Sequence, residues 1–201
     1  LSLVGSEMCI RDRQITEETM RDIKFFKPIL LIISLFLITN CSNNSSMKPE
    51  DFINKKPRLI IEEYLSGNVK AWGVLQNRSG KVIRQFSADL DGKWNGNQLI
   101  LDEKFNWDDG EIQTRQWQIT KIDENNYEGT AGDVVGKAKG YSYGPAFKFE
   151  YVLLVPVKGK QMKITFDDWI FKQDDRVAIN KATMTKFGFK VAELTVVFVK
   201  D

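Results

Sequence analysis

The sequence predicts an all-β domain that closes into an antiparallel up-and-down barrel of about ten strands, preceded by a short helix. After Gly67, apolar and polar residues alternate with a period of two, which is the spacing of side chains on a half-buried strand. Turn residues interrupt this alternation at short intervals. No stretch long enough for a crossover helix separates the segments, so neighbouring strands should run antiparallel.

Short polar turns join the expected strands. Asn95-Gly96 and Asp109-Gly110 are dipeptides that favour the two-residue turns of β-hairpins. An open sheet with this many strands would leave unpaired edges, so we expect it to close into a barrel resembling the lipocalins. The expected strands are Val69–Arg78, Val82–Asp91, Gln98–Trp107, Ile112–Asp123, Asn126–Ala131, Val134–Tyr143, Ala146–Pro156, Gln161–Lys172, Arg176–Thr185 and Lys190–Lys200.

The segment Leu59–Leu65, just before the first strand, predicts the short helix. Its apolar residues fall on one side of a helix, and Gly67 follows as a suitable C-cap. The residues expected on that side are Ile60, Ile61, Tyr64 and Leu65.

The first forty residues have the pattern of a leader and a secretory signal rather than of a folded domain. Residues 1–19 are expected to be a non-native leader, because LSLVGSEMCIRDR resembles a peptide from mistranslated sequencing-adapter reads, and Met20 is the expected start. Residues 20–40 form the expected signal peptide. Their apolar run, Ile29–Thr39, follows a basic flank and is too short to span a bilayer.

The apolar run ends at Cys41 and a polar tract follows, which resembles the lipobox of bacterial lipoproteins. The resemblance implies that Cys41 is acylated and anchors the protein in a lipid bilayer. Ser42 at the next position implies, by resemblance to Gram-negative sorting, the outer membrane with the domain facing the periplasm. Residues 41–56 are expected to be a flexible tether, and residues 57–201 the barrel domain. An ordinary N-terminal anchor, or a secreted protein with an incidental cysteine, is the alternative.

Composition excludes several classes of function. The 29 basic and 27 acidic residues give a formal charge of +2 without a basic block, which argues against a nucleic-acid partner. The chain has no histidine, which excludes Ser-His-Asp and Cys-His triads and zinc sites with histidine ligands. We expect no metal and no cofactor, and we expect a monomer.

Four predicted strand faces that are otherwise apolar each carry one charged residue: Arg84, Glu103, Arg115 and Asp168. Trp117 shares its face with Arg115. Buried charges must be paired or they cost several kcal/mol each, so we expect an internal ionic network. Such a network is either a polar site that orients a ligand or a structural plug in a filled barrel.

Several short motifs resemble the bacterial DUF3833 family over the domain from Pro57 to Asp201, together with the lipobox. They are Ala71-Trp72-Gly73, Arg84-x-Phe86, Gly92-x-Trp94-x-Gly96, Asp108-Asp109-Gly110-Glu111, Gly129-x-Ala131-x-Asp133-Val134, Asp167-Asp168-Trp169 and Lys186-Phe187-Gly188. The resemblance implies a periplasm-facing, lipocalin-like lipoprotein with a link to membrane-lipid modification. It assigns no catalytic residue.

The favoured function is the binding of a small amphipathic or lipid-like ligand, such as a fatty acid, inside the barrel. Arg84 and Arg115 would meet an anionic headgroup, Glu103 and Asp168 would hold them in place, and Trp117 would complete the ligand-binding set. The alternatives are a lipid-modifying enzyme that uses Asp168 as an acid or base, and a structural envelope protein with a filled barrel. The interior volume separates them, because ligand pockets occupy several hundred Å³.

Overall fold

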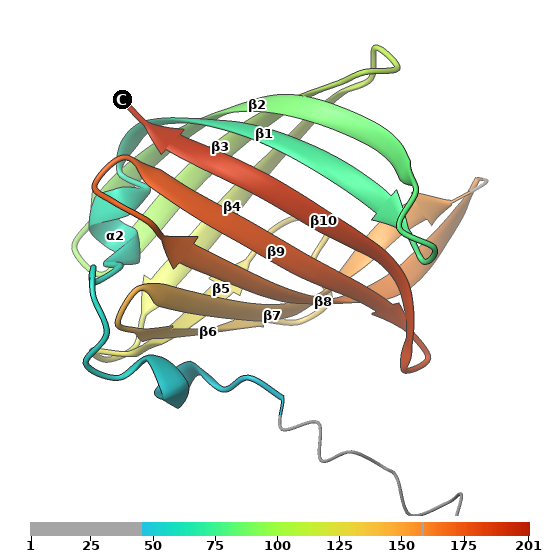
Figure 1. Cartoon of the computed structure of the whole chain (residues 1–201). Coiled ribbons are helices and arrows are strands. Elements are labelled where there is room, and N and C mark those ends of the chain that lie inside the picture. Colours follow the sequence, from blue (N-terminus) through green and yellow to red (C-terminus); the bar gives the residue numbers. More distant parts are fainter. Residues whose placement is uncertain (1–45, 158) are drawn as a thin grey trace, which may run out of the picture. The chain divides into compact units, whose positions relative to one another are not determined.

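The computed structural model describes residues 46–157 and 159–201, and residues 47–201 form one compact unit. In this unit, ten antiparallel strands form a closed barrel in chain order, with β1 pairing with β10 (Figure 1). The predicted up-and-down barrel is therefore confirmed. The strands are β1 (Gly67–Asn77), β2 (Val82–Asn95), β3 (Gln98–Trp107), β4 (Ile112–Lys121), β5 (Asn126–Thr130), β6 (Ala138–Tyr143), β7 (Ala146–Val157), β8 (Lys160–Lys172), β9 (Val177–Lys186) and β10 (Phe189–Lys200). The expected leader, signal peptide and acylated Cys41 lie outside the described residues.

The largest difference from the predicted strands is at β6. The alternation predicted a strand from Val134 to Tyr143, but β6 begins only at Ala138. Gly136 has a φ of 76°, in the left-handed region, and the chain there forms a loop instead of an extended strand. Val134 makes only an isolated bridge to Leu153 on β7. This loop between β5 and β6 places Asp133 near the barrel wall.

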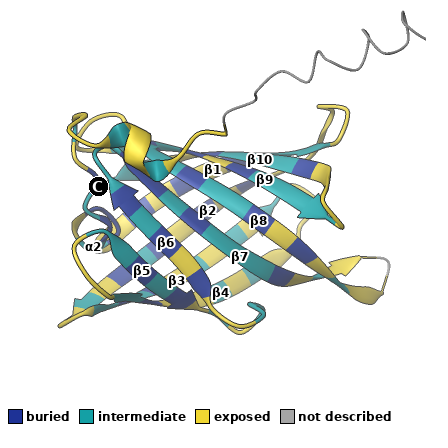
Figure 2. Cartoon of the chain, turned by 90° about the horizontal axis from the view of Figure 1, so that it is seen from below, coloured by how far each residue is buried: buried dark blue, intermediate teal, exposed yellow. Residues whose placement is uncertain are grey.

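Buried and exposed residues alternate along the strands, as expected for a barrel whose inner face is the core (Figure 2). The main cluster of buried residues gathers side chains from nearly all strands, and a smaller one joins β7, β8 and β9. The largest fully buried side chains are Phe147, Leu59, Ile61, Leu99 and Val69.

One end of the barrel is covered by α2 (Ile61–Tyr64), which is shorter than the helix predicted over Leu59–Leu65. Ile60 is extended, with φ −106° and ψ 107°, and Leu59 donates its backbone N–H to the Gly144 carbonyl at 2.8 Å. Because this hydrogen bond holds Leu59 against the barrel and Ile60 is extended, the helix begins only at Ile61. The buried Leu59, Ile61 and Tyr64 side chains belong to the main core cluster.

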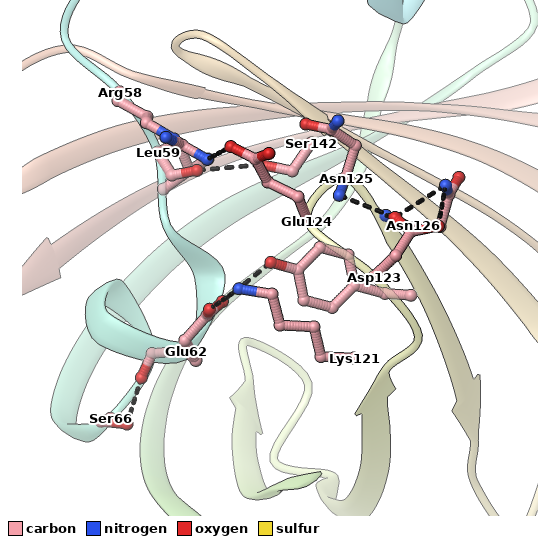
Figure 3. Close-up of polar contacts among 11 residues, drawn as sticks. Arg58, Leu59, Glu62, Ser66, Lys121, Asp123, Glu124, Asn125, Asn126 and Ser142 are labelled. Carbon is pink, nitrogen blue, oxygen red and sulfur yellow. Dashed lines mark hydrogen bonds and ion pairs between the residues drawn. The ribbon is translucent and has the colours of Figure 1, made fainter. Parts of the chain in front are cut away.

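Polar contacts fix this segment to the strands (Figure 3). Glu62 accepts hydrogen bonds from Lys121 on β4 and from the Tyr127 hydroxyl on β5, the latter at 2.8 Å. The Ser142 hydroxyl on β6 donates to the Leu59 carbonyl at 2.9 Å. These hydrogen bonds tie the segment to β4, β5 and β6.

The folded unit begins earlier than the sequence predicted. The tether expected over residues 41–56 is too long, because the 3₁₀ helix η1 (Pro49–Phe52) packs on the barrel. The Phe52 ring centroid lies 5.9 Å from Trp169 and 5.5 Å from Phe171, both on β8. Within the described residues, no helix is long and apolar enough to cross a membrane.

The contact between the α2 segment and β2 predicts a destabilising substitution. A Cβ added at Gly92 would lie 1.7 Å from the Leu65 carbonyl oxygen, so Gly92→Ala must displace backbone. We expect a loss of about 1–3 kcal/mol in the free energy of unfolding, measured by urea denaturation. Gly132→Ala is the matched control, because a Cβ there would meet nothing within 4 Å. Equal stability of the two variants would contradict the packing described here.

Candidate functional site

A cavity of about 110 Å³ lies inside the barrel. It is smaller than typical small-molecule pockets of roughly 300–1,000 Å³, but close to engineered cavities of about 150 Å³ that bind benzene. The space therefore fits a small molecule or one end of a longer one. Most of its wall is aliphatic or aromatic, and five polar or charged residues also line it: Glu103, Arg115, Tyr151, Asp168 and Asn180.

Arg115 on β4 is the charged centre of this wall. The tight turn between β3 and β4 sets the register that places Glu103 directly opposite Arg115, and their side chains approach to 3.7 Å. The guanidinium also binds Asp133 from the β5–β6 loop. Its Nε donates to both Asp133 oxygens at 3.1 Å, and its Nη2 donates to Oδ2 at 2.8 Å. Arg115 is thus compensated by two carboxylates, which raise its pKa although burial opposes this.

Asp168 on β8 is held by two neutral donors. Its Oδ2 accepts a hydrogen bond from the Tyr151 hydroxyl on β7, and its Oδ1 accepts one from the Asn180 side-chain amide on β9 at 3.1 Å. Burial raises the pKa of Asp168 above its ordinary value, although these two hydrogen bonds oppose the shift. Neighbouring Asp167 points to the other face, where it pairs with Lys148 at 3.6 Å.

Glu103 is the least satisfied polar group of the cavity. Its side chain is 13% exposed, and its Oε2 is buried without a hydrogen-bond partner among the described residues. Burial raises the pKa of Glu103 to about 7; Arg115 and the Trp117 side chain oppose this shift, whereas the charges of Asp168 and Asp133 add to it. The carboxyl group therefore exchanges its proton near neutral pH.

Aromatic rings form the apolar part of the wall beside these charges. The Trp117 ring lies 5.1 Å from Phe149 and 5.2 Å from Tyr151, measured between centroids. Tyr151 stacks on Phe166 at 5.0 Å. These contacts fix the Tyr151 ring, whose hydroxyl meets Asp168, and leave a flat apolar surface next to Glu103.

The structure separates Arg84 from the other sequence-predicted site residues. Arg84 is on the inner-face alternation of β2, but its guanidinium donates to Asp109 at 2.7 Å and to Glu111 at 2.9 Å, in the β3–β4 turn. It also lies 4.0 Å above the Trp107 ring. Arg84 does not line the cavity, so the predicted four-member network with Arg84 is wrong.

Glu103, Arg115, Trp117 and Asp168 do come together, and all line the cavity. Three further residues of the site, Asp133, Tyr151 and Asn180, were not predicted from the sequence. The sequence pattern around these residues gave little indication of a site, because Asp133 lies in a loop and the other two are uncharged polar residues on inner faces. Within the described residues, no group of three or more His, Cys, Asp or Glu side chains is arranged to hold a metal ion.

The sequence profile described as "Protein of unknown function (DUF3833)" matches residues 35–200. The chain belongs to this family. The match spans every strand that lines the cavity, and it confirms the family resemblance noted in the motifs. No curated protein matches the sequence of this chain significantly.

Solved structures show the same barrel fold at low sequence identity. An S-type phycobiliprotein lyase from Guillardia theta aligns with a TM-score of 0.52 and 10% identity, covering 70% of this chain and 90% of that one. A DUF3598 protein of unknown function from Nostoc punctiforme PCC 73102 aligns with a TM-score of 0.56 and 15% identity. That alignment covers 73% of this chain and about half, 51%, of the other. The lipocalin-like architecture is consistent with binding of a small ligand, but the fold alone assigns none.

The raised pKa of Glu103 predicts a pH-dependent stability. Because its pKa is about 7 in the folded state and near 4.5 when unperturbed, the folded state holds more protons between these values. The unfolding free energy should therefore be greatest at the acid end and fall as the pH rises through 7, by at most ~3 kcal/mol. Thermal or urea unfolding across this range should show a smaller fall in Glu103→Gln.

The exposed Glu63 provides the matched control. Glu63→Gln should keep the wild-type slope of stability against pH. A wild-type slope in Glu103→Gln would show that Glu103 does not titrate in this range.

Proposed function

We propose that this protein is a membrane-anchored barrel that binds a small amphipathic, lipid-like ligand in its cavity. The observation that carries the proposal is the buried Glu103 Oε2, which lacks a hydrogen-bond partner beside an apolar cavity. A buried acceptor without a donor costs roughly 1–3 kcal/mol, and a bound donor removes this cost.

A purely structural network accounts less well for this carboxyl group. Arg115 and Asp133 form close hydrogen bonds, and both oxygens of Asp168 accept one. Glu103, in contrast, reaches Arg115 only at 3.7 Å. A network that served only to fill the barrel would satisfy its buried members, because an incompletely paired charge destabilises the fold.

The rest of the cavity suits an apolar body. Apart from the polar cluster, the cavity is lined by aliphatic and aromatic side chains such as Leu101, Trp117 and Phe149. The volume of about 110 Å³ accommodates an apolar group close to a benzene ring in size. A ligand with a longer apolar chain would fit only if the side chains that line the cavity moved.

The contacts of Asp168 do not favour the enzymatic alternative. An acid or base must reach the proton that it transfers, whereas the two oxygens of Asp168 are occupied by Tyr151 and Asn180. Binding is therefore the function that the geometry supports best.

Ligand binding is tested with a mixture of 1-pentanol, pentylamine and pentanoate added to the purified full chain. NMR shifts should appear for the cavity-lining residues, among them the Trp117 indole. Ala71 lines the cavity and is 1% exposed, so Ala71→Leu fills the space with added carbons. This variant should lose the shifts while remaining folded.

Ser87→Leu is the matched control, because it adds a larger apolar side chain on the exposed face of the neighbouring strand β2. It should bind like the wild type. The absence of shifts with every probe, or equal binding by Ala71→Leu, would refute the proposed site.

The membrane anchor in this proposal is an acylated Cys41, and its support comes from the lipobox resemblance described above. In this proposal, the acylated cysteine holds the barrel at the outer membrane, facing the periplasm. Cys41→Ser should move the protein from the membrane fraction to the soluble fraction of Gram-negative cells, as detected by immunoblotting. Ser42→Ala, which keeps the cysteine, should stay with the membrane. Membrane retention of Cys41→Ser would contradict lipid anchoring.

A further inference from the structure

We infer that the polar end of the ligand is a hydrogen-bond donor, an amine or an alcohol, and not an anion such as a carboxylate or phosphate. This inference rests on the proposed ligand-binding function. It reverses the expectation that arginines receive an anionic headgroup, and it follows from how the charges of the cavity are distributed.

Both arginines already have carboxylate partners. Arg84 does not line the cavity and pairs with Asp109 and Glu111. Arg115 does line it, but Asp133 occupies its Nε and Nη2 in a two-pronged contact. The remaining nitrogen, Nη1, lies 3.7 Å from Glu103 Oε2, so an anionic ligand there would compete with a carboxylate.

Acidic groups outnumber basic groups around the cavity. Glu103 and Asp133 pair with the single guanidinium of Arg115, and a third carboxyl group, that of Asp168, lies within its electrostatic influence. Among the described residues, no second Lys or Arg lines the cavity. A ligand anion would therefore add a negative charge to a cluster with an excess of acid, whereas an ammonium group would reduce the excess.

In the described part of the chain, the unsatisfied polar atom of the cavity wall is a hydrogen-bond acceptor, Glu103 Oε2. Among the described residues, three buried side-chain atoms lack a hydrogen-bond partner: Arg84 Nε, Glu103 Oε2 and Asp167 Oδ1. Of these, only Glu103 Oε2 belongs to a residue that lines the cavity. When Glu103 is ionised, its oxygens only accept hydrogen bonds, so the ligand must then supply the donor.

Ionisation of Glu103 makes the relative affinity for an amine and for an alcohol depend on pH. Above the pKa of Glu103, the ionised carboxylate attracts an ammonium group in a setting largely removed from water. Binding of the amine should therefore strengthen as the pH rises through neutrality, while binding of the uncharged alcohol should change less. The charged groups that act on the same carboxyl group are Arg115, Asp133 and Asp168, and the Tyr151 hydroxyl also lies within their influence.

The experiment compares the three five-carbon probes separately, so that the chain is constant and only the polar group differs. Each is titrated into the purified full chain near pH 8, and the dissociation constant is taken from NMR shifts of cavity residues. Pentylamine and 1-pentanol should each bind at least about tenfold more tightly than pentanoate. Tighter binding by pentanoate would overturn this inference but leave the ligand-binding function intact. If no probe binds, the binding function itself fails.

Two substitutions of Glu103 test its role directly. Glu103→Gln keeps an acceptor oxygen but removes the charge, so it should weaken pentylamine about tenfold or more and 1-pentanol much less. Glu103→Leu removes the acceptor and should weaken both probes. Glu111→Gln, in the β3–β4 turn outside the cavity, is the control and should bind both probes like the wild type. Unchanged amine binding by Glu103→Gln would overturn the inference.

Discussion

The buried guanidinium of Arg115 is the constraint on which the interior of this barrel depends. A positive charge removed from water must be matched by negative charge within hydrogen-bonding distance. Glu103 supplies part of it across the β3–β4 hairpin, and Asp133 supplies the closer contact from a loop. The second contact holds the β5–β6 loop against the barrel wall, where β6 is shorter than the alternation predicts.

The carboxyl groups that compensate the charge of Arg115 also determine the chemistry of the cavity. Asp133 binds the guanidinium at 2.8 Å, whereas Glu103 Oε2 approaches it only to 3.7 Å and is buried without a hydrogen-bond partner among the described residues. Asp168, held by Tyr151 and Asn180, adds further negative charge nearby. The same arrangement that stabilises the arginine thus produces an acidic, hydrogen-bond-accepting site. The aromatic wall beside it supplies apolar surface, so the cavity has the two properties that an amphipathic ligand requires.

The sequence was sufficient for the fold and for part of the site. Period-two alternation and hairpin turns encode local geometry, so they located the strands and the inner faces. The pairing of Glu103 with Arg115 was also accessible, because each lies six residues from Asp109 at the centre of one tight turn. Asp133 was not accessible, since a loop residue has no face to assign. Arg84 was misplaced because its side chain is long enough to leave its inner-face position and bind the β3–β4 turn.

The most direct test is a crystal structure of the protein soaked with pentylamine. The account predicts a ligand inside the barrel, with its nitrogen within roughly 2.7–3.2 Å of a Glu103 carboxylate oxygen and its carbon chain against Trp117 and Phe149. The Arg115–Asp133 contact should be unchanged. A ligand with its nitrogen directed away from Glu103, or a cavity that remains empty at saturating amine, would contradict the account.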